Sequence, residues 1–152
     1  MIQIVNVPIY KTTVVMIAET SEEEWLEFYK LYDDKITEDD SKCILKDINE
    51  PETCNGATFI LDKGDYVIFI RHNDYEGDVA HEIFHVANKI LCSRGVFHEA
   101  DGEAWAYLIG WLTEQYYDML RDPEREGVFT LPSMTAPEES MTTEESKTIK
   151  EE

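Results

Sequence analysis

The sequence has few basic residues and no long apolar run. Its 152 residues include 13 Lys and Arg against 33 Asp and Glu, which gives a formal net charge of −20. Nucleic-acid binding and docking on an anionic membrane both need clustered basic side chains, so we expect neither kind of partner. The longest fully apolar run, Ala104 to Leu112, is shorter than the ~18 residues expected of a membrane-spanning helix.

Cysteine is also scarce. Cys43, Cys54 and Cys92 are widely spaced and form no CxxC, which is typical of a reducing compartment, although a Cys43–Cys54 pair stays open. The N-terminus lacks the basic start of a signal peptide, so we expect a cytoplasmic protein. The sequence contains no GxGxxG, no P-loop and no GxSxG, and therefore offers no motif for nucleotide binding or for a serine hydrolase.

Composition predicts one folded domain and an acidic tail. Hydrophobic residues make up 43% and aromatic residues 11% of the chain, which is enough for a core. Residues 122 to 152 hold nine acidic and three basic residues with only scattered apolar ones. We predict a domain over residues 1 to 121 and an acidic tail over residues 122 to 152, disordered past about residue 133.

The N-terminal third predicts strands followed by a helix. Apolar residues alternate loosely over residues 2 to 18 and indicate one or two strands. Ser21 followed by Glu24 is a capping-box pattern, and the apolar spacing behind it predicts a helix to about Tyr32. Residues 33 to 55 are highly charged with little periodicity, so we predict a long loop or an insertion there.

The middle of the chain predicts a hairpin and two helices. The β-rich runs Gly56 to Leu61 and Tyr66 to Arg71 flank a turn signal. A helix follows over about residues 74 to 93, with Gly95 as its C-terminal stop, and a second one from about residue 99 or 101 to 120. This order predicts a small α+β domain with a mostly antiparallel sheet.

The segment that carries chemistry is His81-Glu82-Ile83-Phe84-His85, an HExxH motif. Residues four apart lie on one face of a helix, so both imidazoles can reach one ion. Zinc favours imidazole nitrogen at about 2.0–2.1 Å. Glu82 can then accept a proton from water at the metal, as a general base.

The surrounding helix predicts burial of this motif, because apolar residues occupy most of its sides: Val79, Ala80, Ile83, Phe84, Val86, Ala87, Ile90 and Leu91. Burying two histidines and an ionised Glu82 without partners costs several kcal/mol, and a metal is the simplest partner. The alternative is a solvated helix face with incidental histidines, which fits the apolar pattern poorly.

A third ligand is expected on the next helix. Glu103 lies 18 residues after His85, directly before an apolar run. On a helix it shares a face with Tyr107 and Gly110, so Tyr107 could assist the site and Gly110 could allow close helix packing. The alternative for Glu103 is a carboxylate at a helix N-terminus, stabilised by the macrodipole.

HEIFH followed by DGEAWAY resembles the gluzincins, zincin-like zinc metallopeptidases, over roughly residues 66 to 112. The small size resembles minimal zincin-like proteins, including uncharacterised ones encoded by bacteriophages. The resemblance implies a zinc-bearing site with a general base and three metal ligands: Glu82 as the base and His81, His85 and Glu103 as the ligands. It also implies that a strand before the active-site helix presents an edge to substrate, either Gly56 to Leu61 or Tyr66 to Arg71.

Two related families use a third zinc ligand other than glutamate, and the sequence can be compared with each. Metzincins need Gly three and His six residues after the second histidine, but Asn88 and Leu91 stand there. SprT-like proteins use a third histidine, and His98 could serve, although we favour Glu103.

A hydrolase also needs a group that stabilises the developing oxyanion. His98, Tyr75 and Tyr107 are candidates, and an ordinary surface histidine or core tyrosine is the alternative for each. Asp78 lies one turn before the motif and could orient a ligand, or could be an exposed acid at a helix start.

These patterns predict a zinc-dependent hydrolase, a metallopeptidase that acts on a peptide or protein substrate. The alternative is a non-catalytic zincin-like module that binds or regulates a partner. A third hypothesis is an acidic inhibitor that docks on a basic partner through its charge. Oligomeric state stays open.

Overall fold

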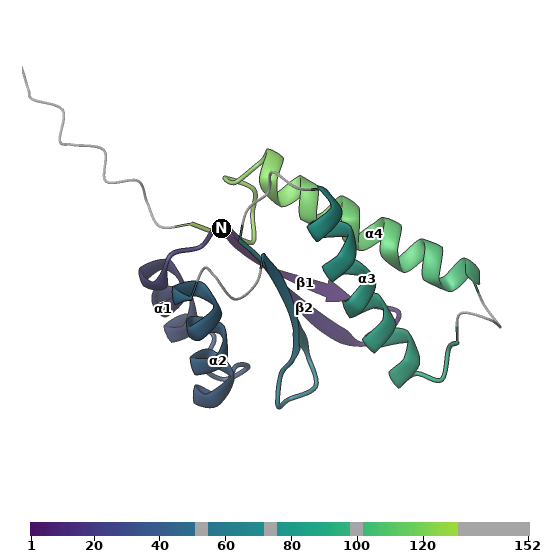
Figure 1. Cartoon of the computed structure of the whole chain (residues 1–152), viewed down its shortest axis with the longest axis horizontal. Coiled ribbons are helices and arrows are strands. Elements are labelled where there is room, and N and C mark those ends of the chain that lie inside the picture. The colour runs from purple at the N-terminus through teal and green to yellow at the C-terminus, as the bar shows by residue number, and fades with distance from the viewer. Residues whose placement is uncertain (51–54, 72–75, 98–101, 131–152) are drawn as a thin grey trace, which may run out of the picture.

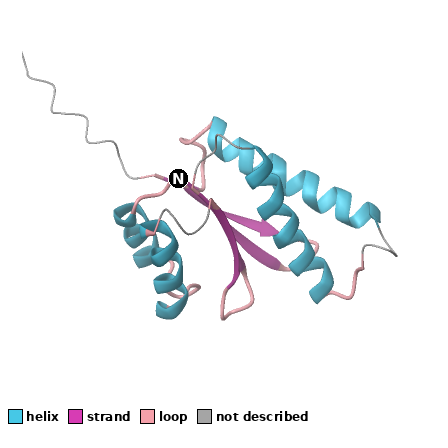
Figure 2. Cartoon of the chain, viewed as in Figure 1, coloured by secondary structure: helices cyan, strands magenta, loops and turns pink. Residues whose placement is uncertain are grey.

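The computed structural model describes residues 1–50, 55–71, 76–97 and 102–130. A five-stranded sheet has a pair of helices on each face (Figures 1 and 2). The elements in chain order are β1 (Ile2–Val7), β2 (Thr12–Ala18), α1 (Glu22–Leu31), α2 (Glu38–Asn49), β3 (Gly56–Ile60), β4 (Tyr66–Ile70), α3 (Glu76–Ser93), α4 (Gly102–Arg121) and β5 (Val128–Phe129). Among the described residues, no helix is long and apolar enough to span a membrane.

The sheet has the strand order β3-β4-β2-β1-β5. The pairs β1–β2, β1–β5 and β3–β4 are antiparallel, and β2–β4 is parallel. The prediction of an α+β domain with a mostly antiparallel sheet is therefore confirmed. A parallel pair needs a long crossover, and the chain between β2 and β4 supplies it with α1, α2 and β3.

Each face of the sheet has its own core. In β2, Val14 and Met16 face α3 and α4, whereas Val15 and Ile17 face α1 and α2. Because side chains alternate between the two faces of a strand, an interior strand buried on both sides reads as a continuous apolar run. This explains the unbroken hydrophobicity of β2 and of β4.

The prediction of a long loop over residues 33 to 55 is wrong, because α2 occupies most of it. Thr37 and Asp40 form a capping box: each side chain accepts a hydrogen bond from the other residue's backbone N–H, both 3.2 Å long. Ile44 and Ile48 are buried one turn apart against the sheet. The many charges on the outer face of α2 hide this short apolar stripe in the sequence.

Other local predictions are confirmed. Ser21 caps α1 by accepting a 3.2 Å hydrogen bond from the backbone N–H of Glu24. The other half of the predicted capping box does not form, because the Glu24 side chain accepts a hydrogen bond from the N-terminal amine of the chain. The predicted hairpin forms from β3 and β4. Gly95 ends α3 with φ 73°, and the Val96 N–H donates to the Leu91 carbonyl as in a Schellman motif. The residues around the predicted start of α3 lie outside the described ranges.

Part of the segment predicted as a tail belongs to the sheet. β5 pairs with the start of β1, placing Phe129 opposite Ile2. The Phe129 ring lies 5.7 Å from the Phe28 ring on α1. The folded domain therefore continues past the predicted boundary at residue 121, and residues 131–152 lie outside the described ranges.

Candidate metal centre

The two histidines of the HExxH motif lie side by side on α3. Their Nε2 atoms are 2.9 Å apart, and their rings meet edge to face with centroids 4.4 Å apart. The His81 side chain is 65% exposed and His85 is half-buried. The prediction that both histidines are buried is therefore wrong: most apolar residues of α3 are buried in the core that it shares with the sheet and α4. Ala80 and Phe84 are exposed, like His81.

The histidine pair fits half of a zinc site. Two imidazole nitrogens on one tetrahedral zinc ion lie ~3.3 Å apart, close to the observed 2.9 Å. The same separation suits an N–H···N hydrogen bond between two neutral imidazoles in different tautomers. Both imidazoles already converge on one point that solvent can reach, so little rearrangement would be needed to bind an ion.

Glu82 differs from the histidines in being buried, at 7% exposure. Its Oε2 accepts a 2.7 Å hydrogen bond from the hydroxyl of Thr58 on β3. Its Oε1 lies 4.0 Å from Nε2 of His81. One carboxylate oxygen thus contacts the sheet and the other lies toward the histidines, which is a suitable position for a base acting beside them.

Gly56 allows β3 to approach this carboxylate closely. A Cβ atom built on Gly56 would lie 2.8 Å from Cγ of Glu82 and 3.2 Å from the carbonyl oxygen of Phe69. Sequence reasoning missed Gly56 and Thr58, because neither belongs to a motif. The available signal was the two-residue period of β3, which places Gly56, Thr58 and Ile60 on one face of the hairpin.

The other side of the histidine pair is bounded by α4. Successive helical residues are 100° apart, so Glu82 and Phe84 flank the histidines on opposite sides. The Phe84 ring lies 5.8 Å from the Trp105 ring of α4 and 6.2 Å from the His85 ring. The histidines therefore sit between edge strand β3 and the N-terminal part of α4.

The structure does not bring Glu103 to the histidines. Glu103 is exposed in the first turn of α4. It lies two residues before Trp105, which turns toward Phe84, so the helix places Glu103 about 160° away from that contact. Among the described residues, no three His, Cys, Asp or Glu side chains gather as a metal site. His98, the other candidate, lies outside the described residues, and the third ligand stays a prediction.

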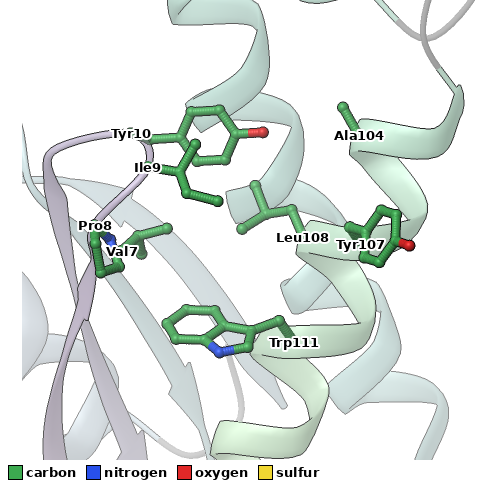
Figure 3. A pocket seen from close by; sticks show the side chains of 8 residues that line it. All are labelled: Val7, Pro8, Ile9, Tyr10, Ala104, Tyr107, Leu108 and Trp111. Carbon is green, nitrogen blue, oxygen red and sulfur yellow. The ribbon is translucent and has the colours of Figure 1, made fainter.

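Tyr107 borders an apolar cavity that is lined by other residues than the HExxH motif. It is 76% exposed and lines an apolar cavity of about 490 Å³ between the β1–β2 hairpin and α4 (Figure 3). The lining residues are Val7, Pro8, Ile9, Tyr10, Ala104, Tyr107, Leu108 and Trp111. They include no residue of the HExxH motif, and the role predicted for Tyr107 at the site stays a prediction.

The remaining predicted residues contribute little to the described site. A Cβ on Gly110 would meet nothing within 4 Å, so its predicted role in close helix packing is wrong. Asp78 is half-buried one turn before the motif, and in the described ranges no hydrogen bond joins it to His81 or His85. Tyr75 lies outside those ranges.

A scan against protein-family models and searches of curated proteins and of solved structures found no match. The likeness to gluzincins therefore rests on the residues of this chain.

Proposed function

We propose that this protein is a zinc-dependent hydrolase of the metallopeptidase type, acting on a peptide or protein. The observation that carries the proposal is the convergence of His81 and His85, 2.9 Å apart at Nε2, beside the buried carboxylate of Glu82. Burying a carboxylate is costly. If the histidines were incidental residues on a solvated face, the burial of Glu82 beside them would have no explanation.

In this proposal His81 and His85 hold the ion, with Glu103 or His98 as the third ligand. A bound zinc ion supplies Lewis acidity, which polarises a carbonyl and lowers the pKa of water. Glu82 accepts the proton of the attacking water at Oε1, the oxygen that lies toward His81. It then delivers that proton to the leaving amine.

The sheet supports one of the two strands considered for substrate binding. β4 pairs with β2 and with β3, so its backbone groups are engaged on both sides. β3 is an edge strand, and an extended peptide can add to such an edge through backbone hydrogen bonds. We therefore place the substrate along β3, and the net charge of −20 favours neutral or basic peptides.

A cytoplasmic location is part of the same proposal. Cys43 and Cys92 are free and exposed, which suits a reducing compartment.

A non-catalytic zincin-like module is the second candidate. It is favoured by the lack of a third metal ligand beside the histidines among the described residues. Zinc content separates the enzyme from a module that holds no zinc: protein purified without chelator should carry close to one zinc ion per chain if it is an enzyme. A content below ~0.2, with no uptake on titration, would favour the non-catalytic module without zinc. A module that uses zinc structurally would also carry the ion, and differs from the enzyme in having no exposed water position at the metal.

Glu82→Gln tests the mechanism directly. We expect this variant to retain zinc and to lose cleavage of a mixed set of neutral and basic fluorogenic peptides by roughly 100-fold or more, because the amide accepts no proton. Cleavage at the parental rate would show that Glu82 is not the base. Loss of zinc together with activity would show that Glu82 acts through the metal site.

A further inference from the structure

β3 carries a hydroxyl that reaches the HExxH motif. We infer that Thr58 is a positioning residue, which holds the Glu82 carboxylate so that Oε1 is the oxygen presented to the reaction. This inference rests on the proposed function and adds to it a residue outside the motif.

The contact is short and involves a charged acceptor. Oγ1 of Thr58 lies 2.7 Å from Oε2 of Glu82 and 3.1 Å from the backbone carbonyl oxygen of Glu82. A threonine hydroxyl has one proton to donate. The carboxylate is the nearer acceptor, and an O–H···O⁻ bond is stronger than a bond to a neutral carbonyl.

The surroundings restrict how Glu82 can move. Burial removes most of the water that could hydrogen-bond the carboxylate in place of Thr58. Gly56 lies against the methylene groups of Glu82 with no room for a Cβ. Thr58 itself is β-branched, so its χ1 is stiff. The flexible Glu82 side chain is thereby held through one carboxylate oxygen, by a threonine of β3.

The two carboxylate oxygens are therefore unequal. Oε2 is engaged by Thr58, whereas in the described part of the chain no hydrogen bond reaches Oε1, which lies 4.0 Å from Nε2 of His81. Without the Thr58 hydroxyl, the carboxylate could rotate and present either oxygen or neither. Accurate placement of a base contributes to the rate of the chemical step rather than to substrate binding.

The first test measures the contact without relying on activity. Urea midpoints are compared for the full-length chain, Thr58→Val, Glu82→Ala and the double variant, with zinc content recorded for each. Thr58→Val should lower the midpoint in the parent and change it much less where Glu82 is absent. An equal shift in both backgrounds would overturn the inference, because the hydroxyl would then act independently of Glu82.

The second test is kinetic. Thr58→Val should lower kcat roughly tenfold with KM within about twofold, and Thr58→Ser, which keeps the hydroxyl, should recover most of the rate. In a Glu82→Gln background Thr58→Val should cause no further loss. Equal damage by Val and Ser, or a change confined to KM, would overturn the inference.

Thr13→Val is the matched control. Thr13 is also a strand threonine, and its hydroxyl contacts Asn6 at 3.5 Å on the exposed surface, so its loss should change neither kcat nor zinc content. If the parent protein cleaves no peptide, the proposed function fails, while the urea comparison still decides whether Thr58 holds Glu82.

Discussion

Thr58 and Glu82 are 24 residues apart in the chain, yet the hydroxyl of one lies 2.7 Å from the carboxylate of the other. This contact joins edge strand β3 to α3, the helix that carries the histidine pair. The side chains of the HExxH motif therefore face in different directions: Glu82 turns toward the sheet, while His81 and His85 face outward.

Gly56→Ala should disturb the site, because the new Cβ would lie 2.8 Å from Cγ of Glu82. Gly56 has no positive φ, so the effect reports on contact rather than on backbone strain. We expect a loss of about 1–3 kcal/mol in the free energy of unfolding and a fall in peptide cleavage, measured by urea unfolding and by peptide assay.

Gly110→Ala is the control for this change. Its Cβ would meet nothing within 4 Å, and alanine in a helix interior is favoured by up to about 1 kcal/mol over glycine. The control variant should be as stable as the parent or more stable, with unchanged cleavage. Equal behaviour of the two glycine variants would contradict the close approach of β3 to Glu82.

Zinc affinity should identify the third ligand. His81→Gln and His85→Gln should each abolish stoichiometric zinc binding in competition with a chromophoric chelator. Glu103→Gln should weaken binding at least tenfold, in line with the gluzincin resemblance, whereas Glu114→Gln, an exposed acid on the same helix, should not. Because Glu103 faces away from the Trp105 contact, its recruitment requires the first turn of α4 to rearrange.

The same zinc-affinity measurement can instead identify His98 as the third ligand. If Glu103→Gln binds zinc like the parent and His98→Gln loses it, the third ligand is His98. In that case α4 can keep its described start when the ion binds.

Alkaline stability should depend on Tyr116. Burial, with smaller contributions from Glu19 and Tyr117, raises the pKa of Tyr116 above its ordinary value. The unfolded chain releases this proton near pH 10, whereas the folded chain holds it to higher pH. The stabilisation is therefore fully present below about pH 10 and is lost as the pH rises toward the folded-state pKa.

Tyr116→Phe removes this contribution, so its urea midpoint should fall less steeply than that of the parent between about pH 9 and pH 11. Tyr107→Phe is the control, because the Tyr107 side chain is largely in solvent, and its slope should match the parent. Identical slopes for the parent and Tyr116→Phe would show that Tyr116 titrates alike in both states.

Local spacing in the sequence determined the features that depend on helix and turn geometry. The four-residue separation of His81 and His85 places their imidazoles together on any helix. Gly95 supplies the positive φ that ends α3, and two apolar runs around a turn signal specify the β3–β4 hairpin. These features could be predicted because each involves residues within a few positions of one another.

Only the tertiary structure decided what surrounds the histidine pair. The parallel pairing of β2 with β4 places β3 at the sheet edge, and packing of α3 on that edge brings Thr58 and Gly56 to Glu82. Docking of Trp105 on Phe84 sets the rotation of α4 and turns Glu103 away. Such contacts follow from burial across the whole domain, so no spacing within the motif could indicate them.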